Sequence, residues 1–408
     1  MKIAFLTSLY PYEKIGKAGN STLYEIIRCL LLNKHEVKVF FCSHKDLIAN
    51  TKQKKSLMKY GKISLEDFSS DISTKNFKKF KYFRKVFQSY KNIEDFKLYK
   101  KKILSSIDQF VPDRIIFFWD TLLELLIDDL GKYHTVYYGA KPPYAAYKNS
   151  IKNYLNIKNI INLIIFKKRE KLHLNRVRKM QEKYNISFRD TLYYKKNKIV
   201  FGYLQNTTKD KYKNRWNEGL KRKKIPKILG NISDINATGN TQGLRFINDK
   251  LFPLIGETLI KKKIYITISG SGDIDKSLKN ILSSRVFRNV GYVKNLQALI
   301  LRSDIILMMN NAGSYTGGYT RIIDFFSAGS CVIAHNKLAD EMPEVKNEFN
   351  ILLGKDEFEI RNHLYNCINN FNLRKKIGVN ARNTFEKFYH PSIISHNLIS
   401  KIFFEKSY

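Results

Sequence analysis

Arg321 and Asp324 are the two side chains whose types and spacing best fit a binding chemistry. They lie three residues apart, so on a helix they share one face of the first turns. Gly317 and Gly318 directly precede this pattern, where the start of a helix presents free backbone N–H groups to an anion. A cation and a carboxylate in that setting suit a ligand with both phosphate and hydroxyl groups. A nucleotide sugar is such a ligand.

The elements that must position these residues form one unit, residues 304–334. An apolar run at 304–309 is typical of a buried parallel strand, and a small polar loop occupies 310–319. A helical pattern follows at 320–328, and a second apolar run at 330–334. In such a strand–loop–helix–strand unit, ligands bind at the carboxyl ends of the strands.

The rest of the chain repeats this alternation in two series. In the first series, a helix at 21–33 with Asn20 or Ser21 as its cap is predicted, as is a helix at 93–110. The first series has predicted strands at 3–9, 36–42, 114–119, 135–138 and 199–204, and helices alone across 151–200 up to the last of these strands. The second series has predicted strands at 225–230, 264–269, 289–293, 304–309, 330–334 and 350–353.

This pattern predicts an α/β protein of two doubly wound domains with parallel sheets that face an interdomain cleft. The 408 residues also favour two domains over one. The predicted boundaries are 1–205 for the first domain, 206–224 for a polar linker and 225–389 for the second domain, while a helix in 390–408 returns to the first domain. The cleft is then the default site.

Polar residues at strand ends of the first domain are candidates for the acceptor side of that cleft. They are Gly16 and Gly19 in the first glycine loop, Asp120 after the strand at 114–119, and Tyr138 and Lys141 after the strand at 135–138. The loop matches no dinucleotide or P-loop fingerprint, so it predicts phosphate binding only weakly.

The net charge of +37 has three possible explanations. Basic patches bind nucleic acid by releasing counterions, and they also bind anionic membrane faces. The third explanation is compositional drift, because Lys, Asn and Ile are abundant throughout the chain. Two clusters favour a membrane surface: residues 75–90, where six basic residues alternate with six aromatics, and the basic helical pattern at 167–183. An ordinary helix with a solvated basic face would also explain the first cluster, and single-stranded nucleic acid would suit it less well.

Other features indicate a cytoplasmic protein. The sparse cysteines, Cys29, Cys42, Cys331 and Cys367, form no C-x-x-C pair and are expected to be free thiols in a reducing compartment. The apolar start of the chain is too short for a signal peptide and runs into a glycine loop, and no apolar run is long enough to span a bilayer. We therefore expect a peripheral protein on the inner face of the plasma membrane.

The second half resembles the donor-binding domain of the GT-B glycosyltransferases, specifically retaining family four. The segments that carry the resemblance occur in the family's order: 228–231, Gly270-Ser271-Gly272, Gly291-Tyr292-Val293, 302–304, 320–324 with 327–329, 343–345 with 350–353, and 373–382. Residues 1–45 also resemble the family's first βαβ unit.

The resemblance implies transfer of a sugar from a nucleotide-sugar donor to a hydroxyl of a glycan or lipid-linked acceptor, in bacterial surface polysaccharide or lipopolysaccharide synthesis. It implies retention of configuration and no metal or other cofactor, with Arg321 on the phosphates and Asp324 on the ribose as the catalytic pair. The implied donor-binding residues are Asn231, Gly270, Ser271, Gly272, Tyr292, Val293, Thr316, Gly317, Gly318, Tyr319 and Thr320. Nucleic acid is not an expected partner.

Three positions differ from the family's usual residues. Thr316 stands where a glutamate is common, Asn231 stands where an arginine is common, and no histidine lies near Tyr138. A non-catalytic sugar- or partner-binding protein on the same fold is therefore the alternative. A nucleic-acid-binding protein, suggested by charge alone, is the third possibility.

Overall fold

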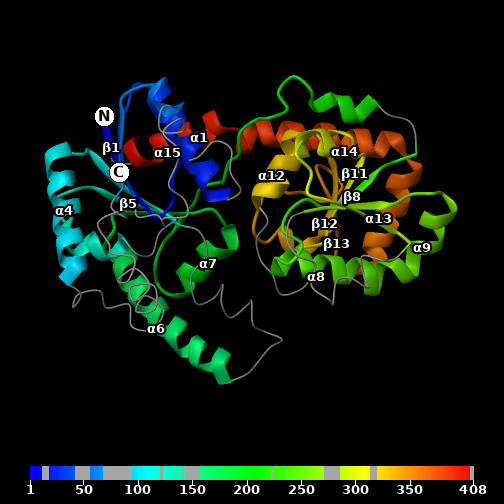
Figure 1. Cartoon of the computed structure of the whole chain (residues 1–408), viewed down its shortest axis with the longest axis horizontal. Coiled ribbons are helices and arrows are strands. Elements are labelled where there is room, and N and C mark those ends of the chain that lie inside the picture. The colour runs from blue at the N-terminus through cyan, green and yellow to red at the C-terminus, as the bar shows by residue number, and fades with distance from the viewer. Residues whose placement is uncertain are drawn as a thin grey trace. The chain divides into compact units, whose positions relative to one another are not determined.

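A computed structural model describes residues 1–11, 18–41, 56–67, 94–119, 123–139, 142, 157–221, 225–270, 285–312 and 319–404. The chain divides into two compact units (Figure 1). Unit 1 comprises Met1–Thr208 with Pro391–Tyr408, and unit 2 comprises Lys209–His390. The basic and aromatic segment at 75–90 lies outside the described residues.

Unit 1 contains a seven-stranded parallel sheet in the order β3-β2-β1-β4-β5-β6-β7. Its strands are β1 (Lys2–Thr7), β2 (Glu36–Phe41), β3 (Ile63–Asp67), β4 (Arg114–Phe118), β5 (Thr135–Gly139), β6 (Glu182–Asn185) and β7 (Gly202–Tyr203). Its helices are α1 (Ala18–Leu32), α4 (Glu94–Phe110), η4 (Leu123–Asp129), α6 (Ile157–Lys179), α7 (Phe188–Lys196) and α15 (Pro391–Phe404). Helix α15, near the C-terminus, packs on α1, near the N-terminus.

Unit 2 contains a six-stranded parallel sheet in the order β10-β9-β8-β11-β12-β13. Its strands are β8 (Ile228–Asn231), β9 (Ile266–Ser269), β10 (Phe287–Gly291), β11 (Ile305–Met308), β12 (Cys331–His335) and β13 (Leu352–Gly354). Its helical segments are η5 (Trp216–Lys221), α8 (Thr238–Phe246), η6 (Ile247–Leu251), α9 (Phe252–Lys261), α11 (Leu296–Leu301), α12 (Tyr319–Ser327), η7 (Asn336–Leu338), α13 (Glu357–Asn369), α14 (Phe371–Thr384) and η8 (Phe385–Tyr389).

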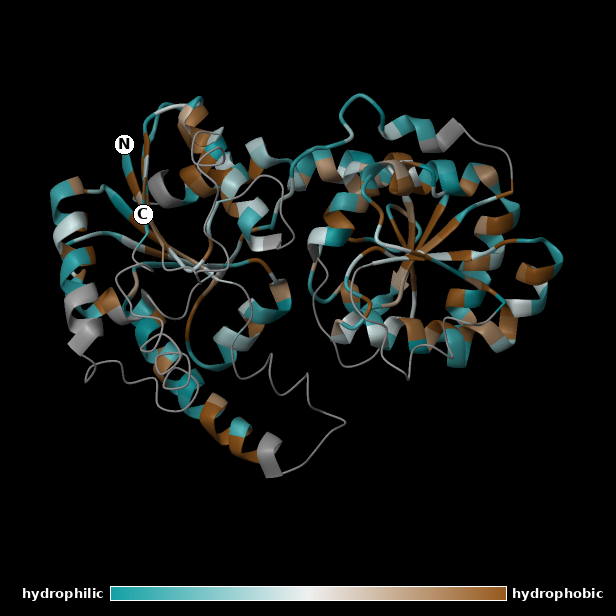
Figure 2. Cartoon of the chain, in the orientation of Figure 1, coloured by the Kyte–Doolittle hydropathy of each residue, from teal (hydrophilic) through white to brown (hydrophobic). Residues whose placement is uncertain are grey.

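Hydrophobic strands form the centre of each unit. All four residues of β11 and all five of β12 are buried, as parallel strands covered by helices on both faces require. Figure 2 shows these central strands of unit 2 in brown, surrounded by helices that carry both teal and brown residues. The buried cores of the two units are separate clusters, one around Phe117 and Tyr194 and one around Leu307 and Ile333.

The predicted fold class, two doubly wound α/β units, is confirmed. In each unit the strand order reverses beside the first strand, so switch points lie between β1 and β4 and between β8 and β11. Ligand sites in such sheets form outside the carboxyl ends of the strands at these points. The register pairs Ile305 and Ile306 of β11 with Ile228 and Leu229 of β8.

Some predicted elements were wrong. Strand β3 was not anticipated, and β6 was assigned to helix, since Glu182 and Lys183 were read as the end of a basic helical pattern that in fact ends at Lys179. Helix α1 begins at Ala18, so Asn20 lies inside its first turn and is not the cap. The Asn20 side-chain amide instead donates to the backbone oxygen of Tyr10 at 2.7 Å.

Gly329, directly after α12, gives a stability prediction. Its φ of +63° is in the left-handed region, and an added Cβ would lie 2.8 Å from the Trp216 ring. Gly291 has a matching φ of +62° but no atom within 4 Å of such a Cβ. We expect Gly291→Ala to lower the free energy of unfolding by about 1–2 kcal/mol through backbone strain. Gly329→Ala should cost about 1–3 kcal/mol more through overpacking.

Urea denaturation of both variants measures the difference. Equal losses for the two glycines would show that Trp216 does not pack against Gly329 as described.

Candidate functional site

The site lies at the β8/β11 switch point of unit 2, where α12 begins. Helix α12 starts at Tyr319 and carries no acidic residue in its first turn, which leaves its N-terminal N–H groups favourable to an anion. Thr320 and Arg321 follow in that turn. Asn310 lies two residues beyond the end of β11, so the same edge of the sheet presents its side chain near α12.

The Arg321 guanidinium is held by a buried amide cluster. Its Nη1 donates to Oδ1 of Asn240, at 2.5 Å, from the first turns of α8. The amide of Asn310 also contacts Asn240 Oδ1 at 2.5 Å, and turning this amide over would instead place its oxygen 2.9 Å from Arg321 Nη1. In either orientation Asn310 belongs to the cluster.

Asn240 is itself fixed from the other side. Its Nδ2 donates to Ser233 Oγ at 2.9 Å and to the backbone oxygen of Asp234, both in the loop that follows β8. Asn240 is 2% exposed and Asn310 is 4% exposed, whereas Arg321 is half-buried. These hydrogen bonds hold the permanently charged Arg321 guanidinium in one orientation at the β8/β11 switch point.

Asp324, one turn further along α12, is engaged in an ion pair. Its Oδ1 lies 3.0 Å from Lys211 Nζ, and the residue is only 8% exposed. Burial raises the pKa of the Asp324 carboxyl, and the Lys211 ammonium acts in the opposite direction. Tyr212 is buried beside this pair, and burial together with the Asp324 charge raises the pKa of its hydroxyl.

The segment 209–216 is fastened to α12 and α14, although residues 206–224 were predicted as a linker. Asp210 forms a bidentate pair with Arg382 of α14, at 2.9 and 2.7 Å. The Arg382 Nη1 also donates to the backbone oxygen of Ser327 at the end of α12, at 2.6 Å. Trp216 then packs on Arg382 and on Gly329. Lys211 and Asp210 thus both secure the C-terminal half of α12, at Asp324 and at Ser327.

The remaining donor-side predictions fall into two groups. Asn231 ends β8, Gly270 directly follows β9, and Tyr292 and Val293 directly follow β10, so parallel strands bring them to the same edge as Arg321. Tyr292 is 77% exposed. The residues outside the described part of the chain are Ser271, Gly272, Thr316, Gly317 and Gly318.

Gly270 has a structural reason for its identity. A Cβ at this position would lie 2.1 Å from the backbone oxygen of Ser233, so a side chain cannot fit between the end of β9 and the loop after β8. Gly270 therefore lies directly against the loop that anchors Asn240.

In unit 1 only two of the acceptor-side predictions can be placed. Gly19 lies in the first turn of α1, and a Cβ there would lie 2.6 Å from Leu9 and 2.8 Å from the Trp119 ring. Tyr138 is fully buried, and its hydroxyl donates to the backbone oxygen of Gln205 at 2.9 Å. Tyr138 braces the segment after β7 and does not line an open surface. Gly16, Asp120 and Lys141 lie outside the described residues.

The sequence reasoning missed Asn240, Asn310 and Lys211. Asn310 was detectable, since it follows a predicted strand at the switch point. Asn240 and Lys211 are 81 and 113 residues from their partners on α12, and no local pattern indicates either contact.

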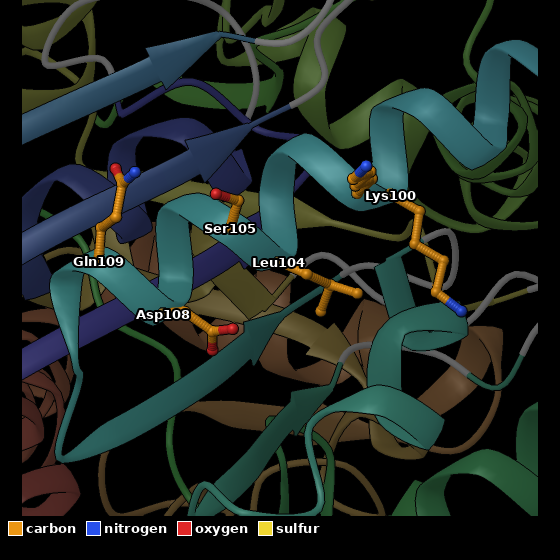
Figure 3. Close-up of a pocket in the computed structure, with 6 residues that line it drawn as sticks. Lys100, Leu104, Ser105, Asp108 and Gln109 are labelled. Carbon is orange, nitrogen blue, oxygen red and sulfur yellow. The ribbon is translucent and has the colours of Figure 1, made fainter.

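An open hollow of ≈ 660 Å³ lies along the surface of α4 in unit 1 (Figure 3). It is lined by Lys100, Lys101, Leu104, Ser105, Asp108 and Gln109. Lys100 is paired with Asp129 at 2.6 Å, and Asp108 with Lys132 at 2.9 Å. The hollow contains none of the predicted site residues and lies on a helix flank, so we assign it no role.

Among the described residues, no three His, Cys, Asp or Glu side chains cluster as metal ligands. A helix with the length and apolarity needed to cross a bilayer is also absent from the described ranges.

The Lys211–Asp324 pair gives a pH-dependent prediction. Because the pKa of Asp324 is raised, the folded chain binds its proton more readily than the unfolded chain, so this group's contribution to stability falls as the pH rises from the unfolded pKa through the folded pKa. Lys211→Met removes the opposing cation and should lower the free energy of unfolding by about 1–3 kcal/mol near neutral pH, less than for a fully buried pair because Lys211 is partly exposed. The loss should shrink on acidification toward the unfolded pKa.

Urea denaturation at about pH 5 and about pH 7.5 measures this trend. Lys213→Met removes an exposed lysine of the same segment and is the matched control. A loss that is independent of pH, or equal in the control, would contradict the electrostatic explanation.

Comparisons with known proteins support the fold. No protein-family model matches the chain, and no curated protein matches it by sequence. Solved structures do match over the whole length. Anabaena HepE in complex with UDP-glucose has a TM-score of 0.59 at 14% identity, covering 98% of this chain and 99% of that chain.

Two further structures give similar values. A glycosyltransferase from Rickettsia africae has a TM-score of 0.63 at 15% identity and covers 100% of both chains. WaaG, a glycosyltransferase involved in lipopolysaccharide biosynthesis, has a TM-score of 0.59 at 11% identity, covering 98% of this chain and 100% of that chain. The chain therefore has the GT-B fold, while membership of family four stays a prediction.

Proposed function

We propose that this protein is a glycosyltransferase that moves a sugar from a nucleotide-sugar donor to a hydroxyl of a glycan or lipid-linked acceptor. The observation that carries the proposal is the Arg321–Asn240 hydrogen bond of 2.5 Å at the β8/β11 switch point, beside the N-terminus of α12. A fixed cation and a helix N-terminus at this place form an anion site. The shared fold with a structure in complex with UDP-glucose favours a nucleoside diphosphate as that anion.

In this proposal Arg321 binds the diphosphate. Transfer leaves a nucleoside diphosphate, and negative charge grows on the bridging oxygen as the bond to the sugar breaks. A guanidinium already held by Asn240 needs no reorientation when that charge develops, which is the condition for electrostatic stabilisation of a transition state. The first-turn N–H groups of α12 add a favourable dipole.

Asp324 is proposed to bind the ribose. Lys211 occupies Oδ1 of the carboxylate, so Oδ2 is the oxygen we assign to the ribose hydroxyls. The Lys211 ammonium opposes the rise that burial gives the pKa of Asp324, and an ionised carboxylate is the stronger hydrogen-bond acceptor. Lys211 therefore acts as a positioning residue.

The finer parts of the proposal rest on the resemblance. They are retention of configuration, independence of metal, a role in surface polysaccharide or lipopolysaccharide synthesis, and a location at the inner face of the plasma membrane. The involvement of WaaG in lipopolysaccharide biosynthesis is compatible with this setting.

Calorimetric titration with UDP tests the donor site. Arg321→Ala should weaken UDP binding by about 10–100-fold, because one charge-assisted contact to phosphate is lost. Arg321→Lys keeps the charge but loses the fork geometry and should be intermediate. The control is Arg302→Ala, which removes an exposed arginine just before β11, at the opposite edge of the sheet.

Absence of UDP binding by the wild type, together with no binding of other nucleoside diphosphates, would refute the proposal. Equal binding by Arg321→Ala and Arg302→Ala would refute the assignment of Arg321.

A non-catalytic binding protein is the second candidate function. The observation that favours it is the burial of Asp324 in an ion pair, together with Thr316 in place of the usual glutamate. A non-catalytic protein would also bind UDP in the titration, but it would neither transfer nor hydrolyse a donor sugar. Release of UDP from a nucleotide-sugar panel in the presence of EDTA would therefore eliminate it.

A further inference from the structure

Helix α6 of unit 1 has two halves with different surroundings. In the second half, Leu174 and Val177 are buried in the core of unit 1, and Met180 just beyond the helix packs with them. His173 is also buried and bonds Glu124 and Tyr194, both at 2.8 Å. The second half is thus a rigid part of the unit.

The first half extends beyond the rest of unit 1, as Figure 1 shows, and is largely brown in Figure 2. Ile160, Ile161 and Ile164 are 49%, 53% and 56% exposed, although isoleucine is among the residues most often buried. Leu163, Ile165 and Phe166 are also partly exposed. Two helical turns therefore present apolar side chains to solvent on most of their circumference.

Basic side chains form a patch on one face of the helix, directly behind this apolar tip. Lys167, Lys168 and Lys171 are exposed, and within the described part of the chain they form no ion pair. Eight basic residues stand against the single acid Glu170 along the whole helix, and Glu170 is 4% exposed and bonded to Tyr193. The exposed surface of this helix is therefore apolar at its tip and cationic behind it.

The spacing fits the layers of a lipid surface. Ile164 precedes Lys168 by one turn and Ile160 precedes Lys167 by about two turns, roughly 6 and 10 Å along the axis. Helices that lie in a membrane interface bury their apolar face about 5–10 Å into the boundary between headgroups and acyl chains, and a helix that enters tip first to that depth would bury about the length of the apolar tip. With the tip at that depth, the lysine side chains lie at the level of the phosphates.

We propose that residues 160–166 insert into the surface of an anionic lipid bilayer, with Lys167, Lys168 and Lys171 binding lipid phosphates. Charge complementarity selects this occupant, because a purely apolar partner would leave the three lysines unmatched. The helix docks on one leaflet, since an apolar stretch this short cannot span the ~30 Å hydrocarbon core. This inference is independent of the donor site.

Vesicle sedimentation tests the inference on the full-length protein. The probe is vesicles of equal parts phosphatidylcholine and phosphatidylglycerol, compared with pure phosphatidylcholine. Ile160→Ser/Ile161→Ser/Ile164→Ser should lower the partition coefficient at least about tenfold. Lys167→Gln/Lys168→Gln/Lys171→Gln should lower it about 10–100-fold, with an effect that diminishes at high salt.

The matched controls alter similar side chains elsewhere on unit 1. Val200→Ser removes a valine that is 83% exposed, and Lys101→Gln/Lys195→Gln/Lys196→Gln removes three exposed lysines. Both controls should bind vesicles as the wild type does. Ile164→Trp should show blue-shifted fluorescence with anionic vesicles, which reports insertion directly.

Three outcomes would overturn the inference: equal binding to neutral and anionic vesicles, unchanged binding by the isoleucine variant, or a change in its oligomeric state that accounts for the loss. The last would assign the tip to a second copy of the chain. UDP titration of the isoleucine variant separates the two proposals, because its donor binding should equal that of the wild type.

Discussion

The hydrogen bond from Arg321 to Asn240 is the constraint on which the candidate site depends. A lone guanidinium at a helix start would sample many orientations, and its affinity for an anion would be reduced by the entropy of ordering it. Asn240 removes that freedom, and Ser233 and Asp234 in turn fix Asn240. The loop after β8 therefore holds Asn240 of α8, and Asn240 in turn fixes the position of the Arg321 guanidinium on α12. Close packing at Gly270 holds the neighbouring loop in place.

A second constraint is the attachment of residues 209–216 to α12 and α14. Buried charges are costly, and here each has a partner: Arg382 with Asp210, and Asp324 with Lys211. Arg382 also satisfies the backbone oxygen of Ser327, an acceptor at the C-terminal end of α12 that no intrahelical bond can use. These contacts hold the C-terminal half of α12, while the Arg321–Asn240 hydrogen bond holds its first turn beside the strand ends. Removing Lys211 would leave the Asp324 carboxylate buried without its cation.

Sequence patterns predicted the parallel strands well where they are buried on both faces. The apolar runs of β1, β4, β11 and β12 left little ambiguity, and the α/β alternation followed from them. Strands β3 and β6 failed for the same reason. Their sequences, ISLED and EKYN, are short and polar and carry no clear strand periodicity. They form strands because they pair with a neighbouring strand of the sheet.

The candidate site was predictable only in part. Arg321 and Asp324 were visible because both stand on one short helix after a recognisable strand. Their partners were not, because Asn240 and Lys211 meet α12 only through tertiary packing. Tyr138 shows the opposite failure, since a strand end predicts nearness to a site but not exposure. The structure thus adds three residues to the predicted pair. Asn240 and Asn310 contact Arg321 or its partner, and Lys211 pairs with Asp324.

Hydrogen–deuterium exchange with and without saturating UDP measures the central claim most directly, because it locates the ligand on the chain without relying on activity. The predicted result is slower exchange at the first turn of α12, residues 319–322, and in the loop at 310–312, with Arg321→Ala abolishing the effect. Unchanged exchange in these two segments at saturating UDP, or protection confined to other parts of the chain, would contradict a donor site at the β8/β11 switch point.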